Sequence, residues 1–461
     1  MAGIEVPGLD LVRRYDGRVP RYTSYPTADR FHEEISARDY REACAEGNAQ
    51  RRPLSLYFHL PFCATVCYYC ACNRIVTANR ARAREYLDLL KEEIRLQAAL
   101  FTPGRPVRQL HWGGGTPTFL SAAEMTELMH YTARHFHLLE ADRGEYGIEI
   151  DPRTVDTGTL GLLRGLGFNR LSVGVQDFDR QVQVAVNRVQ SVEQVQMVTE
   201  TARSLGFRSI SYDLIYGLPH QDVSSFARTL DQVVTLRPDR LSVFNYAHLP
   251  ARFPVQRQID ESTLPSPAEK LEIMAETMRR LPGAGYVHIG MDHFALPEDE
   301  LVAARASGEL QRNFQGYSTG GGADLVGMGI SSIGDIGGLY VQNERGIPAW
   351  GEALRAGFLP LARGYVPTGD DRLRRRVIMD IACRGELRFA DIGREHGIDF
   401  ASCFAGELRA LESFQKDGIV RRTESGLVVT GTGRFLLRNV CAVFDRHLHR
   451  DGAPAGYSRA I

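Results

Sequence analysis

The chain has 461 residues, of which 43% are hydrophobic and 24% are charged, so a generally disordered protein is excluded. Its 55 Lys and Arg residues and 56 Asp and Glu residues leave a net charge of −1, which gives no overall attraction to nucleic acid or anionic membranes. No run approaches the ~20 apolar residues of a membrane span, and the N-terminus carries charges where a signal peptide is apolar. We therefore expect a cytoplasmic protein, monomeric, with no nucleic-acid or membrane partner.

The N-terminal 45 residues are predicted to form an arm. Residues 13–27 are rich in Arg, Tyr and Pro and show neither a helical nor a strand period. This pattern predicts an extended segment that lies on the body of the protein.

Regular alternation of strand-like and helical patterns begins at residue 54. The strand-like runs are apolar and rich in β-branched residues, and they lie at 54–60, 109–114, 146–151, 170–176, 209–218 and 240–247. The helical patterns lie at 81–100, 121–136, 154–166, 191–205, 223–236 and 266–281. Such alternation builds a parallel sheet, so we expect an α/β fold, an incomplete parallel (β/α)6 barrel over 46–365, with a doubly wound sheet as the alternative.

The last part of the chain, residues 366–461, is predicted to form a mostly helical domain. Helical patterns lie at 370–383, 389–396 and 400–416, a hairpin turns at 424–426, and a last helix is expected over 432–447. Helices with a hairpin are typical of a winged helix. A basic run at 372–376 could suggest DNA binding, but the near-neutral chain favours a solvated or partner-facing helix.

Cysteines are unevenly distributed. Four scattered ones are interpreted as small buried hydrophobic residues: Cys44, Cys383, Cys403 and Cys441. The others follow the first predicted strand within ten residues: Cys63, Cys67, Cys70 and Cys72. Thiolates at the first three positions can bind three corners of a 4Fe-4S cluster and leave the fourth iron open. Zinc is the main alternative, although four ligands in so short a loop would be cramped.

The C-x3-C-x2-C loop after the first strand resembles that of the radical S-adenosylmethionine (SAM) superfamily. In that superfamily the open iron binds SAM, whose reductive cleavage gives a 5′-deoxyadenosyl radical. A second signal is the stretch GGGTP at 113–117, which follows the second strand. Glycines there allow the backbone to approach a ligand closely.

Further stretches resemble the oxygen-independent coproporphyrinogen III oxidases of haem biosynthesis along nearly the whole chain. They include PRYTSYPTA at 20–28, YFHLPFC at 57–63, HWGGGTPT, IEIDPR, DLIYGLP, RNFQGY and RNVCAVFD. The resemblance implies oxidative decarboxylation of the ring A and B propionates of coproporphyrinogen III to vinyl groups, giving protoporphyrinogen IX. It also implies one 4Fe-4S cluster, two SAM molecules, and a reductant and an electron acceptor that the sequence does not identify.

The same resemblance implies residue roles. Cys63, Cys67 and Cys70 would bind the cluster, and Cys72 would be a catalytic residue that is not a ligand. The positions around the cluster-bound SAM would be Tyr57, Gly114, Glu149 and Ile333. Those around the second SAM would be Tyr69, Gly115, Thr116, Gln176, Arg188, Asp213 and Ala247.

Several of these side chains suit such roles. Glu149 ends a strand, where its carboxylate could accept both ribose hydroxyl protons. Asp213 lies in an apolar strand and would need a partner, which a cationic cofactor supplies. Arg188 could pair with a methionine carboxylate, and Gln176 could bond adenine or carboxylate. Each also has a structural reading, as a salt bridge, a buried hydrogen bond or a surface side chain.

Some positions depart from the family pattern. Tyr69 stands where Phe is usual, Ala71 where Gly is usual and His220 where Lys is common. The sequence at 334–338, directly after Ile333, also differs from that pattern. None of these changes removes a predicted cluster ligand.

Two other functions remain open. A haem-binding, chaperone-like relative could use His59 or His248, although a satisfied structural histidine is the simpler reading of each. A radical SAM methyltransferase or cyclopropane-forming enzyme would also use two SAM molecules. For the tetracarboxylate substrate of the first reading, Arg21 and Tyr22 of the arm are candidate contacts, and the arm is expected to shield the radical.

Overall fold

The computed structural model describes residues 5–15, 17–140 and 142–450. The first four residues of the predicted arm and the last eleven of the predicted C-terminal domain lie outside the described residues. Within the described ranges, no helix is long and apolar enough to cross a membrane.

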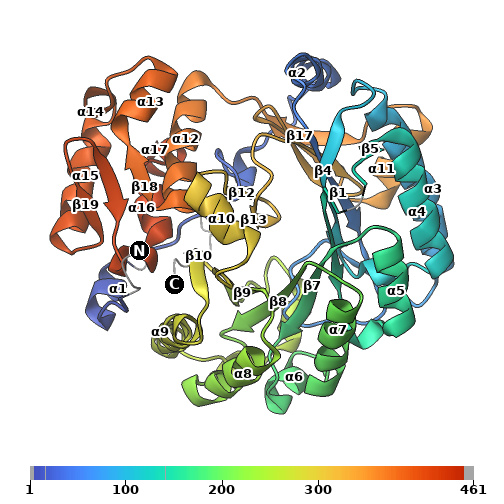
Figure 1. Cartoon of the computed structure of the whole chain (residues 1–461), viewed down its shortest axis with the longest axis horizontal. Helices are drawn as coiled ribbons and strands as arrows, with labels where there is room; N and C mark the ends of the chain where they lie inside the picture. Colours follow the sequence, from blue (N-terminus) through green and yellow to red (C-terminus); the bar gives the residue numbers. More distant parts are fainter. Residues whose placement is uncertain (1–4, 16, 141, 451–461) are drawn as a thin grey trace.

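The predicted barrel strands are present and lie side by side in a parallel arrangement. In spatial order they are β1 (Leu54–Leu60), β4 (Pro106–Gly114), β6 (Glu145–Ile150), β7 (Arg170–Gln176), β8 (Ser209–Tyr216) and β9 (Arg240–Asn245). The intervening helices cover the outside (Figure 1): α3 (Ala81–Ala98), α4 (Ala122–His135), α5 (Thr157–Gly165), α7 (Val192–Ser204), α8 (Val223–Leu236) and α9 (Pro267–Gly283). The alternation therefore builds the curved parallel sheet that the sequence predicts.

Local capping explains where several of these helices begin. Ser121 accepts a hydrogen bond from the backbone N–H of Glu124 at the start of α4, and the Glu124 carboxylate accepts one in return. The same reciprocal arrangement joins Ser191 to Gln194 at α7 and Ser266 to Glu269 at α9. Each such capping box satisfies N–H groups that have no partner within the helix.

The sheet continues beyond the predicted strands on both sides. Next to β1 lie β14 (Asp324–Met328), which is parallel to it, and the antiparallel strands β15 (Ile333–Ile336), β16 (Leu339–Asn343) and β17 (Leu361–Tyr365). Next to β9 lie β11 (His293–Ala295) and β10 (Val287–Gly290), and the short β5 (His137–Leu138), which pairs with β4, completes a 13-stranded sheet. Sequence analysis missed these strands because they have only two to five residues and show no sustained period.

The C-terminal region packs helices against a small antiparallel sheet. Its helices are α12 (Gly369–Arg384), α13 (Phe389–His396), α14 (Phe400–Cys403) and α15 (Ala405–Lys416), and its strands are β18 (Glu386–Arg388), β19 (Val420–Arg422) and β20 (Gly426–Val429). The single helix predicted over 432–447 is wrong, because the chain forms α16 (Leu437–Val443) and then α17 (Arg446–Arg450). The Asp445 carboxylate accepts hydrogen bonds from the N–H groups of His447 and Leu448 and so starts a new helix.

The scattered cysteines are buried with one exception. Cys44, Cys383 and Cys441 are buried, as predicted. Cys403 is exposed, because it ends the short helix α14, whose only buried residue is Phe400.

The N-terminal arm is not entirely extended. Leu9–Tyr15 forms the helix α1, so the extended conformation predicted from residue 13 onward is wrong at its start. Long-range contacts stabilise this helix: the Tyr15 ring packs 4.5 Å from that of Phe414, and Arg14 pairs with Asp417 at 2.8 Å. A second helix, α2 (Ala37–Ala49), spans the predicted arm boundary at residue 45.

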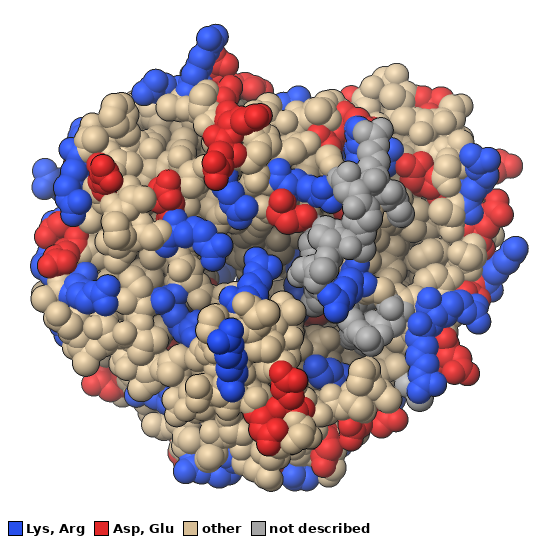
Figure 2. All heavy atoms as spheres, turned by 180° about the vertical axis from the view of Figure 1, so that it is seen from behind, with Lys and Arg blue, Asp and Glu red and all other residues tan. Residues whose placement is uncertain are grey.

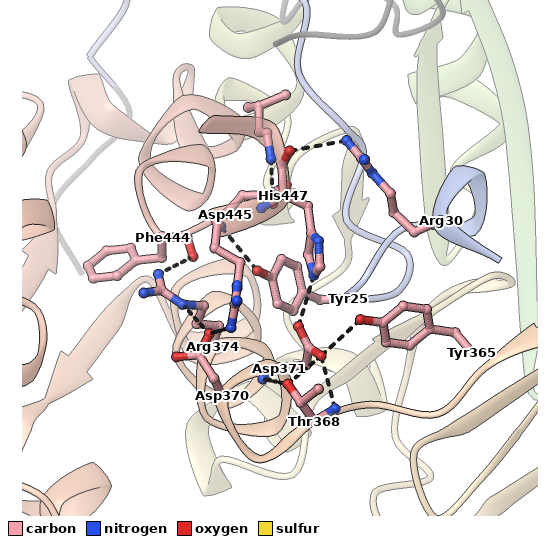
Figure 3. A network of polar contacts seen from close by, with 12 residues as sticks. Tyr25, Arg30, Tyr365, Thr368, Asp370, Asp371, Arg374, Phe444, Asp445 and His447 are labelled. Carbon is pink, nitrogen blue, oxygen red and sulfur yellow. Dashed lines mark hydrogen bonds and ion pairs between the residues drawn. The ribbon is translucent and has the colours of Figure 1, made fainter. Parts of the chain in front are cut away.

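The rest of the arm is fastened to the C-terminal helices (Figure 3). The Tyr25 hydroxyl accepts a hydrogen bond from the backbone N–H of Arg446, and Arg30 donates to the carbonyl of His447 at 3.1 Å. His447 in turn lies 2.8 Å from the Asp371 carboxylate at the start of α12. This part of the arm is therefore packed against the C-terminal helices, through hydrogen bonds to residues more than 400 positions away.

Candidate active site

A cavity of about 560 Å³ occupies the interior of the barrel. Its walls are the inward-facing residues of the parallel strands, which recur at every second position because side chains alternate across a strand. Three further elements contribute: the arm through Arg21 and Thr23, the hairpin of β12 (Gln311–Asn313) and β13 (Gly316–Ser318), and the segment 331–333. Seen from behind, the molecular surface is hollowed near its middle, and Lys and Arg side chains border the hollow (Figure 2).

Polar side chains line much of this cavity. Ser172, Ser211 and Ser242 face inward from β7, β8 and β9, where an ordinary barrel would place bulky apolar residues. Small hydroxyl side chains leave room for a ligand and offer it hydrogen bonds. This lining is typical of a binding site rather than of a filled core.

One end of the cavity is closed by an ion-pair network. Arg170, at the start of β7, contacts Glu300 and lies 3.8 Å from Glu145. Arg240, at the start of β9, pairs with Asp299 at 2.8 Å. Since these residues stand at the N-terminal ends of the strands, a ligand must enter from the opposite, carboxyl end.

The cysteine loop begins at that carboxyl end, directly after β1. The hydroxyl of Thr116 donates to Cys63 Sγ at 3.6 Å, and the guanidinium of Arg188 donates to Cys67 Sγ at 3.5 Å. Each of these two sulfur atoms therefore has a hydrogen-bond donor from outside the cysteine loop.

The two remaining cysteines of the loop interact with each other. A hydrogen bond from Cys72 lowers the pKa of the Cys70 thiol and raises that of Cys72, and the charge of Arg74 lowers the pKa of Cys70 further. Cys70 therefore has the character of a ligand thiolate, while Cys72, an exposed residue, is the neutral donor beside it.

The glycine stretch holds the loop in place. The N–H of Gly115 donates to the carbonyl of Leu60, and that of Thr116 donates to the carbonyl of Phe62 at 2.8 Å. A Cβ on Gly115 would lie 2.6 Å from the Pro61 backbone, and one on Gly114 would lie 2.5 Å from the His59 ring. Only glycine permits this approach, which explains the run at 113–115.

This donor set fits an iron–sulfur cluster. A cubane cluster takes one thiolate at each of three separated corners. Cys63, Cys67 and Cys70 come from one loop, and the pKa of Cys63 is raised by burial and by the charges of the other two thiols. A bound cluster would relieve that mutual repulsion.

Glu149 and Tyr57 lie beside the glycine stretch and line the cavity. Glu149 accepts a hydrogen bond from the N–H of Gly114 at 3.0 Å and lies 3.3 Å from the His111 ring. Burial raises the pKa of Glu149, but its contacts with His111 lower it overall, so the carboxylate is ionised. The Tyr57 ring stacks on that of His111.

Ile333 also lines the cavity, and a buried carboxylate holds its loop. Glu93, on α3, accepts hydrogen bonds from the N–H of Gly329, from Asn343 and from the indole of Trp350. Burial raises the pKa of Glu93 to about 7. Sequence analysis missed Glu93, because its position on a helix face reveals nothing about the strand loops that it contacts.

Asp213 projects into the cavity from β8. Its carboxylate accepts a hydrogen bond from Ser172 at 2.7 Å, and burial raises its pKa to about 6. Of the predicted site residues, Asp213 joins Tyr57, Glu149 and Ile333 on the cavity wall. A cation placed there would stabilise its ionised form.

Arg188 and Gln176 lie at the carboxyl end of β7. Arg188 already pairs with Asp151 at 3.1 Å and donates to the carbonyl of Gly174, while its Nε has no hydrogen-bond partner among the described residues. Gln176 adopts a φ of 66°, an unusual backbone angle for a residue with a side chain. The surface-arginine reading of Arg188 is wrong, because only 9% of its side chain is exposed.

Tyr69 and Ala247, far apart in sequence, are joined by a residue that sequence analysis missed. The Gln256 amide donates to the carbonyl of Tyr69 at 3.1 Å and to that of Ala247 at 3.3 Å. Gln256 is 1% exposed. Its segment carries no motif, so only the folded chain reveals this contact.

Three other candidates have partners within the protein. Both ring nitrogens of His59 are engaged, by Tyr57 and by the carbonyl of Asn73, and those of His248 by Tyr246 and Glu261. The Tyr22 hydroxyl donates to Asp445 and does not line the cavity. Arg21 does line it.

Comparison with known proteins agrees with this site. The Radical SAM superfamily matches residues 57–233, and the HemN C-terminal domain matches residues 368–436. The chain is 54% identical to the oxygen-independent coproporphyrinogen III oxidase of Pseudomonas aeruginosa over 439 residues, which are 95% of each chain. It is 47% identical to that of Escherichia coli over 453 residues, 98% of each chain. The solved structure described as coproporphyrinogen III oxidase (HemN) from Escherichia coli, a radical SAM enzyme, superposes with a TM-score of 0.91 at 46% identity, covering 96% of this chain and 100% of that chain.

The parallel barrel, with a three-cysteine loop and a glycine stretch at its carboxyl end, defines a radical SAM protein. Within that class the identity extends from the arm to the last helices. The chain belongs to the oxygen-independent coproporphyrinogen III oxidases.

Proposed function

We propose that this protein catalyses the oxygen-independent oxidative decarboxylation of coproporphyrinogen III. The ring A and B propionates become vinyl groups, and the product is protoporphyrinogen IX of haem biosynthesis. The observation that carries this proposal is the 54% identity to a coproporphyrinogen III oxidase over 95% of the chain. A polar cavity directly beneath the cysteine loop supports it.

Cys63, Cys67 and Cys70 would hold the 4Fe-4S cluster, with Tyr57, Gly114, Glu149 and Ile333 around the SAM molecule on its open iron. When bound, the two groups supply a 5′-deoxyadenosyl radical that can remove a hydrogen atom from the β-carbon of a propionate. Glu149 is suited to a ribose, because it is ionised and already fixed by Gly114 and His111. Cys72 would act as a catalytic donor beside Cys70 without binding iron.

A second SAM molecule would lie among residues of the cysteine loop, the glycine stretch and the carboxyl-end halves of neighbouring strands and the loops beyond them. They are Tyr69, Gly115, Thr116, Gln176, Arg188, Asp213 and Ala247. Two features support this placement. Among the described residues no Lys or Arg pairs with the Asp213 carboxylate, which accepts a hydrogen bond from Ser172, and the Nε of Arg188 has no hydrogen-bond partner within the same ranges.

The remaining parts of the molecule have supporting roles in this proposal. The arm would close the cavity and shield the radical, since Arg21 and Thr23 form part of its wall. The C-terminal domain, residues 366–461, would hold the arm in place. An external reductant is required because cleavage of each SAM consumes one electron, and an electron acceptor is required because each decarboxylation releases one electron after hydrogen removal. We place the protein in the cytoplasm as a monomer, where its thiols stay reduced.

The test is an anaerobic assay of the reconstituted protein with coproporphyrinogen III, SAM and a chemical reductant. We expect protoporphyrinogen IX, detected after oxidation by its porphyrin fluorescence and mass. Methylated or cyclopropanated product would favour a different radical SAM activity, and stable haem binding without turnover would favour a carrier.

A further inference from the structure

Positive charge gathers where the arm meets the barrel. Arg21 of the arm lies 3.8 Å from the Asp292 carboxylate, and its guanidinium stands 5.5 Å from the Phe244 ring. Arg312, on β12, donates through Nε to the carbonyl of Arg21 at 3.1 Å. Arg438, on α16, donates to the carbonyls of Val19 and Pro20. Arg312 and Arg438 are thus fastened to the arm segment that carries Arg21, so three guanidinium groups and one carboxylate share this region.

The pKa values of Asp292 and Arg438 are shifted in the directions that an excess of positive charge produces. Burial raises the pKa of Asp292, but Arg21, Arg438 and Arg312 lower it overall, so Asp292 is ionised. Burial and the charge of Arg21 lower the pKa of Arg438 to about 10. One negative charge is shared by three positive ones, and the region attracts another anion.

Hydrogen-bonding groups in the same wall lack partners. Arg312 is 6% exposed, and its Nη1 has no hydrogen-bond partner among the described residues. The same is true, within the described ranges, of Gln315 Nε2 and of His293 Nδ1. All three residues line the cavity. Buried polar atoms of this kind are ordinarily satisfied, so their convergence points to a bound ligand.

Neighbouring rings fix this arrangement. The guanidinium of Arg312 stands 4.7 Å from the Tyr317 ring, which also packs edge-on against His293. The Nε of Arg312 donates to the Arg21 carbonyl, and the guanidinium lies against the Tyr317 ring. These two contacts fix the direction of Nη1, which has no partner among the described residues. A preorganised guanidinium of this kind matches a carboxylate.

We propose that Arg312, with Arg21 and Gln315, binds a propionate carboxylate of the porphyrinogen and so positions it in the cavity. This inference rests on the proposed function and extends it by assigning substrate contacts. The chemistry alone would also accept the carboxylate of a SAM molecule. We favour the propionate, because the arm contributes to this site. No residue of the arm is among the positions that the family resemblance assigns to SAM.

The experiment measures equilibrium binding of coproporphyrin III, the stable oxidised form of the substrate, to the reconstituted holoenzyme by fluorescence. In Arg312→Gln we expect affinity to fall at least ~30-fold, as for the loss of one buried charge partner. Arg312→Lys, which keeps the charge but not the fork, should fall in between. Arg388→Gln removes an equal charge from a side chain that is 71% exposed and should bind like the wild type.

A parallel titration with SAM separates the two carboxylate sources. Weakened porphyrin binding with unchanged SAM binding supports the proposal, whereas weakened SAM binding with unchanged porphyrin binding overturns it. Mesoporphyrin IX, which lacks the ring A and B propionates, refines the positive result. Equal Arg312→Gln losses for both porphyrins assign the site to a ring C or D propionate, and loss only for coproporphyrin assigns it to ring A or B.

Unchanged cluster absorbance and an unchanged melting temperature in Arg312→Gln would exclude misfolding as the cause of weaker binding. If the wild type binds coproporphyrin and Arg312→Gln binds it equally well, this inference is overturned and the proposed function is not. Wild-type protein that binds no coproporphyrin would instead contradict the proposed function.

Discussion

Two walls of the cavity are built in different ways. The wall beneath the cysteine loop consists of short contiguous segments whose backbones interlock, as in the bonds from Gly115 and Thr116 to residues 60 and 62. The wall beneath the arm includes Arg21 and Arg312, which line the cavity, and long-range contacts hold it: Asp292 pairs with Arg21, and Arg438 donates to the neighbouring backbone of the arm. The first wall carries the predicted cluster ligands next to it. The second carries the guanidinium groups that we propose bind a substrate carboxylate.

This difference indicates how the two functions are divided. Radical generation requires fixed geometry around the cluster, and closely packed glycines give it. Recognition of a tetracarboxylate requires positive charge, and in our proposal Arg312 and Arg21, which are distant in sequence, supply it. Substitutions in the first wall should therefore impair cluster binding, whereas substitutions in the second should impair substrate binding.

The largest expected effect comes from the cluster ligands. Changing Cys63, Cys67 or Cys70 to Ser should abolish cluster binding, since each would remove one of three corners. Cys72→Ser should keep the cluster, because Cys72 is not a predicted ligand, and lose activity, because a much less acidic hydroxyl replaces the thiol that donates to Cys70. Iron content and visible absorbance after anaerobic reconstitution check both. Equal iron loss in all four variants would contradict the assignment of Cys72.

Removal of the arm should have the next largest effect. Deleting residues 1–27 should leave the cluster in place, because its ligands come from a separate loop. Turnover should fall steeply, and more 5′-deoxyadenosine should be released per vinyl group, because an open cavity admits water and side reactants. Tyr22 and Tyr25 are buried, so the melting temperature should fall as well. An unchanged ratio of 5′-deoxyadenosine to vinyl per folded molecule would show that the arm only stabilises the fold.

A smaller effect is expected from the glycine stretch. Gly115→Ala places a Cβ 2.6 Å from the Pro61 backbone and should cost ~1–3 kcal/mol of stability while lowering cluster occupancy. Gly161→Ala is the matched control, because no atom lies within 4 Å of its added Cβ on α5. That control should be neutral or slightly stabilising. Denaturant unfolding and iron analysis measure both variants, and equal behaviour would refute the close-packing argument.

The smallest effect concerns the protonation of Asp213. Its pKa is raised to about 6 by burial, so the folded protein binds this proton more tightly than the unfolded chain does. Stability is therefore lost as pH rises from about 4 to about 6. Asp213→Asn should remove that loss and be more stable than the wild type above pH 6, by ~1–3 kcal/mol, with no difference at low pH.

The matching measurement is unfolding of the reconstituted protein without added SAM across this pH range. Adding SAM should reduce the advantage of Asp213→Asn, since a cation beside Asp213 favours the carboxylate. A pH-independent difference would contradict the raised pKa.

Much of the first wall could be predicted from the sequence, and little of the second. The β/α units carry apolar runs of sufficient length, and the cysteine and glycine motifs are local, each next to its strand. Arg312 instead contacts a residue 291 positions away, and Gln256 one 187 positions away. Short strands such as β15 and the helix α1 were also missed or misread, because tertiary contacts rather than local period stabilise them.

One measurement tests the central claim most directly, namely that a radical made at the cysteine loop acts on a propionate held in this cavity. Coproporphyrinogen III carrying deuterium at the propionate β-carbons is incubated anaerobically with the enzyme, SAM and reductant. The account predicts that 5′-deoxyadenosine gains one deuterium atom for each vinyl group formed. Vinyl formation with unlabelled 5′-deoxyadenosine would contradict it.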